Sequence, residues 1–130
     1  MVKRDLYLKR IRPFMNKDLI KVITGIRRCG KSVMLELIQQ ELMKDGIPAK
    51  AIFSYNFESM SLSHLCTAKA LHQDVLEKTK GHTGKVYIFF DEIQEVKEWE
   101  KAINSFRVDM DCDIYITGSN SKLLSGELST

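Results

Sequence analysis

Residues 25–32 read G-I-R-R-C-G-K-S and match the pattern G-x-x-x-x-G-K-[ST]. The two glycines allow a tight backbone turn whose N–H groups point inward, and a following helix directs its positive end at the same place. Such a loop binds the phosphate groups of a nucleotide. The flanking residues fit, because an apolar, β-branched run, 19–24, precedes the loop and a run with helical periodicity, 33–43, follows it.

The loop residues have distinct expected roles. Lys31 would reach the terminal phosphates with its charge and assist catalysis, and the Ser32 hydroxyl would ligate a Mg²⁺ ion that bridges those phosphates. Arg27 and Arg28 occupy variable positions, where a solvated side chain and a contact to phosphate, a partner subunit or nucleic acid both remain open. The nucleotide-binding residues predicted in and beside the loop are Gly25, Ile26, Arg27, Arg28, Cys29, Gly30, Lys31, Ser32 and Val33.

Composition and length predict a single domain. The chain has 130 residues, of which 44% are apolar, and a formal net charge of +3. That charge is uneven, because residues 1–31 carry a net charge of +8 and residues 32–130 carry −5. The basic front end provides a favourable field for a nucleotide, and a nucleic acid or an acidic protein partner is the alternative.

Cysteine usage and hydropathy predict a cytoplasmic protein that does not enter a membrane. The three cysteines are odd in number and include no C-x-x-C pair, which indicates a reducing compartment. The longest apolar run, 86–90, has five residues, and the charged N-terminus lacks the apolar segment of a secretory signal.

Strands and helices alternate along the chain, which predicts an α/β fold with a parallel sheet. We expect an amphipathic helix at 3–16, which Pro13 would kink or end, and one ATPase core domain over 1–130. The expected strands are 19–24, 51–57, 86–90 and 114–117, and the expected helices between them are 33–43, 63–79 and 99–108.

Two carboxylates follow the most apolar strand. Mg²⁺ needs octahedral oxygen ligation that one serine cannot complete, so Asp91 is predicted as the second metal ligand, acting through a bound water. Glu92 would point elsewhere and polarise an attacking water as the general base of hydrolysis.

Three segments together resemble a known family: I-K-V-I-T-G-I-R-R-C-G-K-S, V-Y-I-F-F-D-E-I-Q-E-V-K-E-W-E and I-Y-I-T-G-S-N-S-K-L-L. They are similar to prokaryotic AAA-superfamily P-loop ATPases, whose core precedes a separate C-terminal domain. The resemblance implies a three-layer α-β-α fold in which the strand ending in T-G-S lies between the loop strand and the D-E strand. It also implies that Ser119, or alternatively Asn120, senses the γ-phosphate, and that Asn56 restrains the catalytic glutamate.

The resemblance further implies a fifth strand, a helical lid and nucleotide-contacting arginines beyond Thr130. Without the fifth strand, the loop strand 19–24 would form an apolar edge of the sheet. We therefore expect the chain to self-associate, or to be less stable than a longer form.

The resulting hypothesis is a Mg²⁺-dependent ATPase core that converts nucleotide state into a conformational signal. One alternative is a non-hydrolysing, nucleotide-dependent DNA-binding or regulatory module, which the basic front end favours. The other is a small P-loop kinase, which would need no hydrolytic base beside Asp91.

Overall fold

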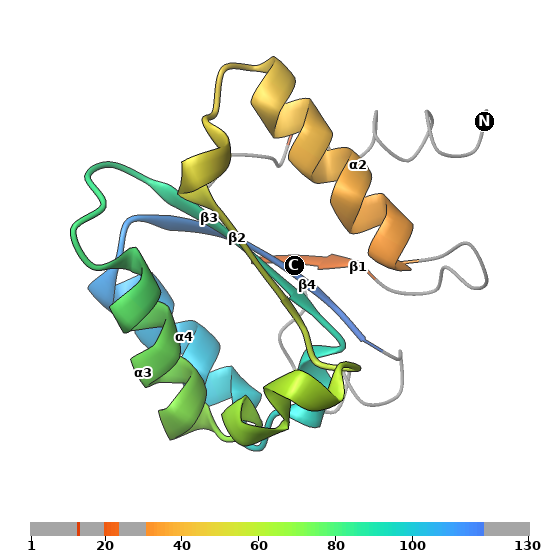
Figure 1. Cartoon of the computed structure of the whole chain (residues 1–130), viewed down its shortest axis with the longest axis vertical. Helices are drawn as coiled ribbons and strands as arrows, with labels where there is room; N and C mark the ends of the chain where they lie inside the picture. Colours follow the sequence, from red (N-terminus) through yellow and green to blue (C-terminus); the bar gives the residue numbers. More distant parts are fainter. Residues whose placement is uncertain (1–12, 14–19, 24–30, 119–130) are drawn as a thin grey trace.

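Four parallel strands form the sheet at the centre of the computed structural model, which describes residues 13, 20–23 and 31–118 (Figure 1). Their order across the sheet is β1-β4-β3-β2, and each neighbouring pair is parallel. The strand that precedes T-G-S therefore lies between the loop strand and the D-E strand, which confirms the expected order. The strands are β1 Ile20–Ile23, β2 Ile52–Asn56, β3 Val86–Asp91 and β4 Cys112–Thr117.

Helices cover both faces of this sheet, and the three layers of the expected fold are confirmed. Helix α2, Lys31–Lys44, lies on one face, and helices α3, Ala68–Thr79, and α4, Trp99–Asp109, lie on the other (Figure 1). Three short 3₁₀ helices connect them to the strands: η2 Ala49–Ala51, η3 Met60–Leu65 and η4 Ile93–Glu95.

Alternating side chains of the strands form two hydrophobic clusters. Every residue of β3 and β4 is buried, as expected for central parallel strands that carry helices on both sides. Toward α3 and α4 the strands present Ile88, Phe90, Ile114 and Ile116, among others. Toward α2 they present Ile23, Tyr87, Phe89 and Tyr115.

The predicted helix 63–79 is wrong at its start, because the structure divides this segment in two. A 3₁₀ helix ends at Leu65, and α3 begins only at Ala68. Thr67 has extended backbone geometry, and its Oγ1 accepts a hydrogen bond from the Ala70 N–H, as a helix N-cap does. Lys97 pairs with this extended residue in an isolated bridge, and its N–H donates to the Cys66 carbonyl. Lys97, which lies outside this segment, thus fixes the change in chain direction between the 3₁₀ helix and α3.

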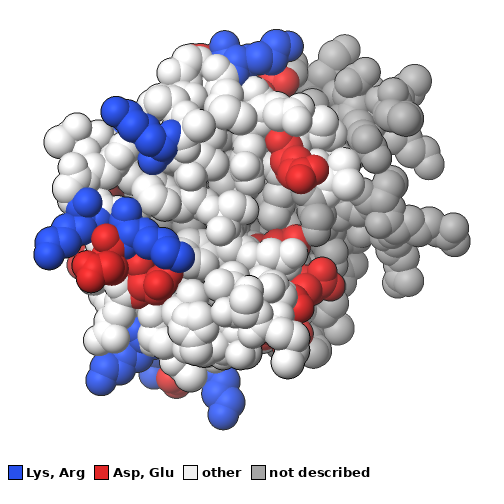
Figure 2. Space-filling model, viewed as in Figure 1, with Lys and Arg blue, Asp and Glu red and all other residues white. Residues whose placement is uncertain are grey.

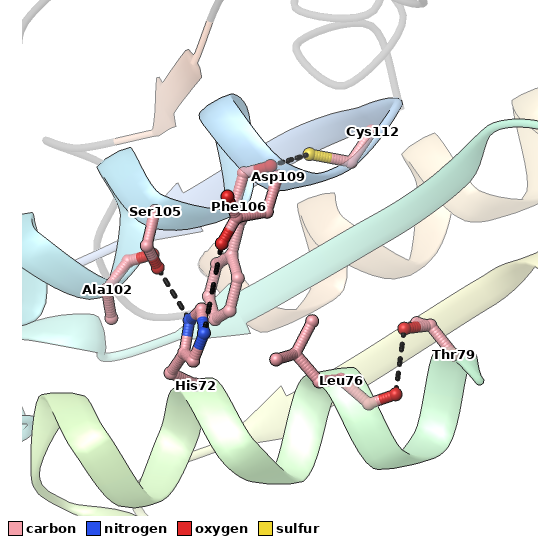
Figure 3. Close-up of polar contacts among 8 residues, drawn as sticks. All are labelled: His72, Leu76, Thr79, Ala102, Ser105, Phe106, Asp109 and Cys112. Carbon is pink, nitrogen blue, oxygen red and sulfur yellow. Dashed lines mark hydrogen bonds and ion pairs between the residues drawn. The ribbon is translucent and has the colours of Figure 1, made fainter.

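A polar cluster joins α3 to α4, the two helices that cover the same face of the sheet (Figure 3). His72 Nδ1 lies 2.7 Å from Ser105 Oγ, its Nε2 lies 3.9 Å from an Asp109 carboxylate oxygen, and its ring stacks on Phe106. The Ser105 hydroxyl donates to the Ala102 carbonyl, so its hydrogen points along its own helix and not toward His72. These contacts therefore link two helices and do not activate Ser105 as a nucleophile.

The expected N-terminal helix 3–16 lies outside the described residues, apart from Pro13. The predicted end of the first described helix is confirmed, because α2 ends at Lys44 and Gly46 has a φ of 99°. Glycine adopts this left-handed conformation without the steric penalty of a Cβ atom, which suits the residue that closes a helix.

Candidate functional site

The carboxyl ends of all four strands meet along one edge of the sheet. Ile23, the last residue of β1, is paired with Thr117, the last residue of β4. Asn56 at the end of β2 is paired with Asp91 at the end of β3. A hydrogen bond between Thr117 and Asp91 joins the two pairs. In open α/β sheets this edge is where ligands bind.

The Thr117 hydroxyl connects the two acidic residues that the sequence singles out. Its Oγ1 donates to Asp91 Oδ1 over 2.5 Å and accepts the Glu92 N–H over 3.0 Å. Thr117 is fully buried and Asp91 is only 5% exposed, so the carboxylate is held against the sheet. A hydroxyl that uses both its donor and an acceptor site in this way fixes the relative positions of Asp91 and Glu92.

Glu92 leaves the strand with an unusual backbone geometry. Its φ of 59° and ψ of 53° lie in the left-handed region, which non-glycine residues seldom adopt. The side chain is half-buried, and Gln94 Nε2 donates to its Oε1 over 2.6 Å. The backbone of Glu92 therefore does not continue the extended course of β3, and the roles of Asp91 as metal ligand and Glu92 as base stay predictions.

Asn56 lies level with Asp91 across the β2–β3 pair. Its Oδ1 accepts the N–H of Glu58, two residues later, over 3.0 Å. This short turn holds the exposed side chain at the end of β2. The restraint of Glu92 by Asn56 that the resemblance implies stays a prediction.

Many predicted site residues lie outside the described part of the chain. These are residues 25–30 of the phosphate loop, together with Ser119 and Asn120. Lys31 and Ser32 form the start of α2, and only their backbone is described. Val33 follows them in α2 and is half-buried. The predicted roles of all these residues stay predictions.

One lysine of the basic front end is not on the surface. Lys21 is 2% exposed, and its ammonium forms an ion pair with Asp113, which is fully buried. Lys21 therefore adds nothing to a basic binding surface. On the face seen in Figure 2, the described lysines and arginines are scattered, some of them beside acids, and form no single basic area.

Two residues of the site were missed by the sequence analysis. The sequence analysis treated Thr117 only as the last residue of a strand. A threonine directly before G-S could have indicated a polar side chain at the site. Gln94 lies two residues after Glu92, and this spacing alone does not predict a contact. The left-handed geometry of Glu92 creates that contact.

Comparison with known proteins identifies the family. A family model described as "AAA domain" matches residues 17–130, which is most of the chain. This chain belongs to the AAA domain family. The domain is therefore a P-loop ATPase-like domain, in agreement with the sheet order and the acidic strand end.

The AAA domain also has similar proteins in distant organisms. An uncharacterized protein of Haemophilus influenzae is 43% identical over 130 residues, which cover all of this chain and 32% of that protein. An uncharacterized protein of Methanocaldococcus jannaschii is 37% identical over 131 residues, covering all of this chain and 26% of that protein. The chain thus spans about a third or less of each relative. No solved structure matches it.

The helices α2, α3 and α4 of the described part have 14, 12 and 11 residues. None of them combines the length and the apolar character needed to cross a membrane.

Proposed function

We propose that this AAA domain binds ATP together with Mg²⁺, hydrolyses the ATP and passes the nucleotide state on as a conformational change. The observation that carries the proposal is the contact of Thr117 with both Asp91 and Glu92, at the sheet edge where β1 ends. The predicted phosphate loop is the segment that follows β1 in the sequence. Family membership supports the nucleotide as the ligand.

The side chains at this edge suit Mg²⁺. Asp91 contributes a carboxylate, and Ser32 is predicted to contribute a hydroxyl, both of them the hard oxygen ligands that Mg²⁺ prefers. Magnesium is usually bound by one or two protein oxygens, with phosphate and water oxygens completing its shell. When bound, the ion would neutralise charge on the β- and γ-phosphates.

Glu92 is proposed as the general base. Its backbone is held by Thr117 and its carboxylate by Gln94, so its position beside Asp91 is fixed. A carboxylate oxygen there can accept the proton of a water that attacks the terminal phosphate. Lys31 would balance the charge of the phosphates from the start of α2.

The conformational signal is proposed to pass through Thr117. This residue is buried at the end of β4 and touches β3 through Asp91, so a displacement of that carboxylate cannot leave β4 unaffected. A nucleic acid or a protein that binds the basic front end would then respond to the nucleotide state.

A small kinase remains the second enzymatic candidate. Analysis of the reaction products separates a kinase from a hydrolase.

The test combines ligand binding with phosphate release. ATP and GTP are titrated with and without Mg²⁺, and thermal stability and released phosphate are both measured. We expect ATP with Mg²⁺ at a hundredfold excess over Kd to stabilise the chain by ~2.7 kcal/mol. Lys31→Ala should abolish this shift, and Asp91→Ala should weaken only its Mg²⁺-dependent part.

Glu92→Gln separates chemistry from binding. It should keep the ATP-dependent shift and release no phosphate, because a neutral amide cannot take a proton from water. Glu58→Gln is the matched control, since Glu58 is an exposed glutamate that follows the neighbouring strand β2. Equal loss of nucleotide binding in the Glu92 and Asp91 variants would contradict the division of roles. Phosphate transfer to a second substrate without hydrolysis would favour the kinase.

A further inference from the structure

The short helix η4 holds Gln94 in a fixed place beside Glu92. Ile93, which precedes Gln94, is fully buried, and Val96, which caps the helix, is 1% exposed. Both belong to the hydrophobic cluster under α3 and α4. The backbone of Gln94 is thus anchored on both sides, so its side chain starts from a well-defined position.

The contact between Gln94 and Glu92 is short and depends on strained backbone. Gln94 Nε2 lies 2.6 Å from Glu92 Oε1, and its second neighbour, Glu95 Oε2, is 3.5 Å away. Residues two apart do not face each other on a helix. Here the left-handed geometry of Glu92 turns the chain so that they do. Backbone strain of this kind is typical of functional sites.

The other end of the same amide is the Gln94 Oε1 oxygen. This oxygen is buried and has no hydrogen-bond partner among the residues that the structure describes. Rotating the amide by half a turn would place this oxygen against the Glu92 carboxylate, so the observed orientation follows from the acidic neighbour. A buried acceptor without a donor destabilises the fold, and such an exception calls for an explanation.

We propose that Gln94 is a positioning residue that holds the Glu92 carboxylate in the direction needed for hydrolysis. The inference rests on the proposed function, because it assigns Gln94 a role through the general base. A glutamate side chain is flexible, and catalytic groups must be held to a fraction of an ångström. One charge-assisted hydrogen bond from an anchored amide supplies that restraint, at the cost of the unpaired oxygen.

Gln94→Met tests the role, because methionine keeps the length of the side chain and removes both the donor and the unpaired oxygen. We expect kcat for phosphate release to fall about 10- to 100-fold, the effect typical of lost supporting contacts, while the affinity for ATP stays within twofold. The midpoint of urea unfolding without nucleotide should stay the same or rise. Gln73→Met is the matched control, since Gln73 is exposed on α3.

Nuclear magnetic resonance of the nucleotide-free chain tests the contact itself. The side-chain amide protons of Gln94 should exchange with solvent more slowly than those of Gln73, and Glu92→Leu should remove this protection. Equal exchange at both glutamines in the parent would overturn the inference.

The possible outcomes distinguish this inference from the proposed function. Phosphate release by the parent and an unchanged kcat in Gln94→Met would overturn the positioning role and leave the ATPase proposal standing. A Gln94→Met variant that loses stability and ATP affinity together would show a merely structural residue. A parent that binds ATP but releases no phosphate, or binds no ATP, would overturn the ATPase proposal and the positioning role with it.

Discussion

A single hydroxyl organises the acidic end of the central strands. Thr117 satisfies a backbone N–H of Glu92 and a carboxylate oxygen of Asp91 while being fully buried itself. The arrangement of the two acids should therefore depend on the Thr117 oxygen more than on the size of its side chain.

Replacing Thr117 by valine removes the oxygen and keeps the shape. We expect Thr117→Val to lower the free energy of unfolding by about 2 kcal/mol, because the buried Asp91 carboxylate and the part-buried Glu92 N–H each lose the hydrogen bond to the hydroxyl. It should also weaken Mg²⁺-dependent ATP binding. Thr117→Ser, which keeps the hydroxyl, is the control and should retain most of both quantities. Urea denaturation and a thermal-shift titration measure them, and equal losses in the two variants would contradict the role of the oxygen.

At the scale of an element, β1 is attached to the sheet by an ion pair as well as by its backbone. Lys21 pairs with Asp113, the Tyr115 hydroxyl donates to the other Asp113 oxygen over 2.7 Å, and the ammonium lies 5.2 Å from the Tyr115 ring centre. A shift of β1 by one residue would separate the charges and turn Lys21 to the opposite face. The pair therefore specifies how β1 is aligned with β4.

Breaking this pair from one side should be costly. Lys21→Met removes the Lys21 ammonium from the buried Asp113 carboxylate, and we expect a loss of about 3–5 kcal/mol in the free energy of unfolding. Lys21→Met combined with Asp113→Leu removes both charges and should recover part of that loss. Chemical denaturation of the two variants checks this, and a double variant that is less stable than the single one would contradict the explanation.

A second polar contact attaches β2, at the opposite margin of the described sheet from β1, to helix α3. The Tyr55 hydroxyl donates to an Asp74 oxygen over 2.9 Å, and Lys78 pairs with the same carboxylate over 3.0 Å. Burial, followed by the hydrogen bond and charge of Asp74, raises the pKa of Tyr55 well above its usual 10.0. Burial and the charges of Asp113 and Asp111 also raise the pKa of Tyr87.

These raised tyrosine pKa values predict a loss of stability in alkali. The unfolded chain releases its tyrosine protons near pH 10 while the folded chain keeps them, so stability is fully present below pH ~10 and falls above it. Tyr55→Phe should cost about 1 kcal/mol at neutral pH, through the lost hydrogen bond, and should make the alkaline decline shallower. Urea denaturation from pH 8 to 11 measures both effects. An unchanged slope would show that Tyr55 does not contribute.

For the whole molecule, the order of the strands leaves β1 at one margin of the described sheet. Among the described strands, β1 is paired on one side, with β4. Parallel strands are normally covered, because an uncovered row of N–H and C=O groups pairs readily with other chains. The sequence analysis expected this strand order, and the structure confirms it.

We therefore keep self-association as a prediction. The weight-average mass in sedimentation experiments should rise with protein concentration, and amide exchange in β1 should slow over the same range. A monomer at all concentrations with a well-protected β1 would mean that other residues of the same chain cover this strand.

Much of this architecture could be predicted from the sequence, and the exceptions have physical reasons. Apolar runs and helical periodicity gave the four strands and the helices between them, but the strand order came from the family resemblance, because local patterns do not specify which strands pair. The break before α3 depends on Lys97, thirty residues away from Thr67. Lys21 was included in the charge of the basic front end, and its burial could not be predicted locally because its partner Asp113 lies far along the chain.

The same strand order has a consequence for how the protein is made. Of the described strands, β1 is synthesised first and pairs with β4, which is synthesised last, so the ladder that carries the candidate site closes across most of the described chain. Contacts so distant in sequence form slowly, because the entropy of closing a long loop is lost before the contacts form. Synthesis proceeds at about 5–20 residues per second, so the apolar β1 must remain unpaired for several seconds. Within the described sheet, the candidate site is therefore among the last features to form, and a chaperone that shields β1 during synthesis would protect the strand that waits longest for its partner.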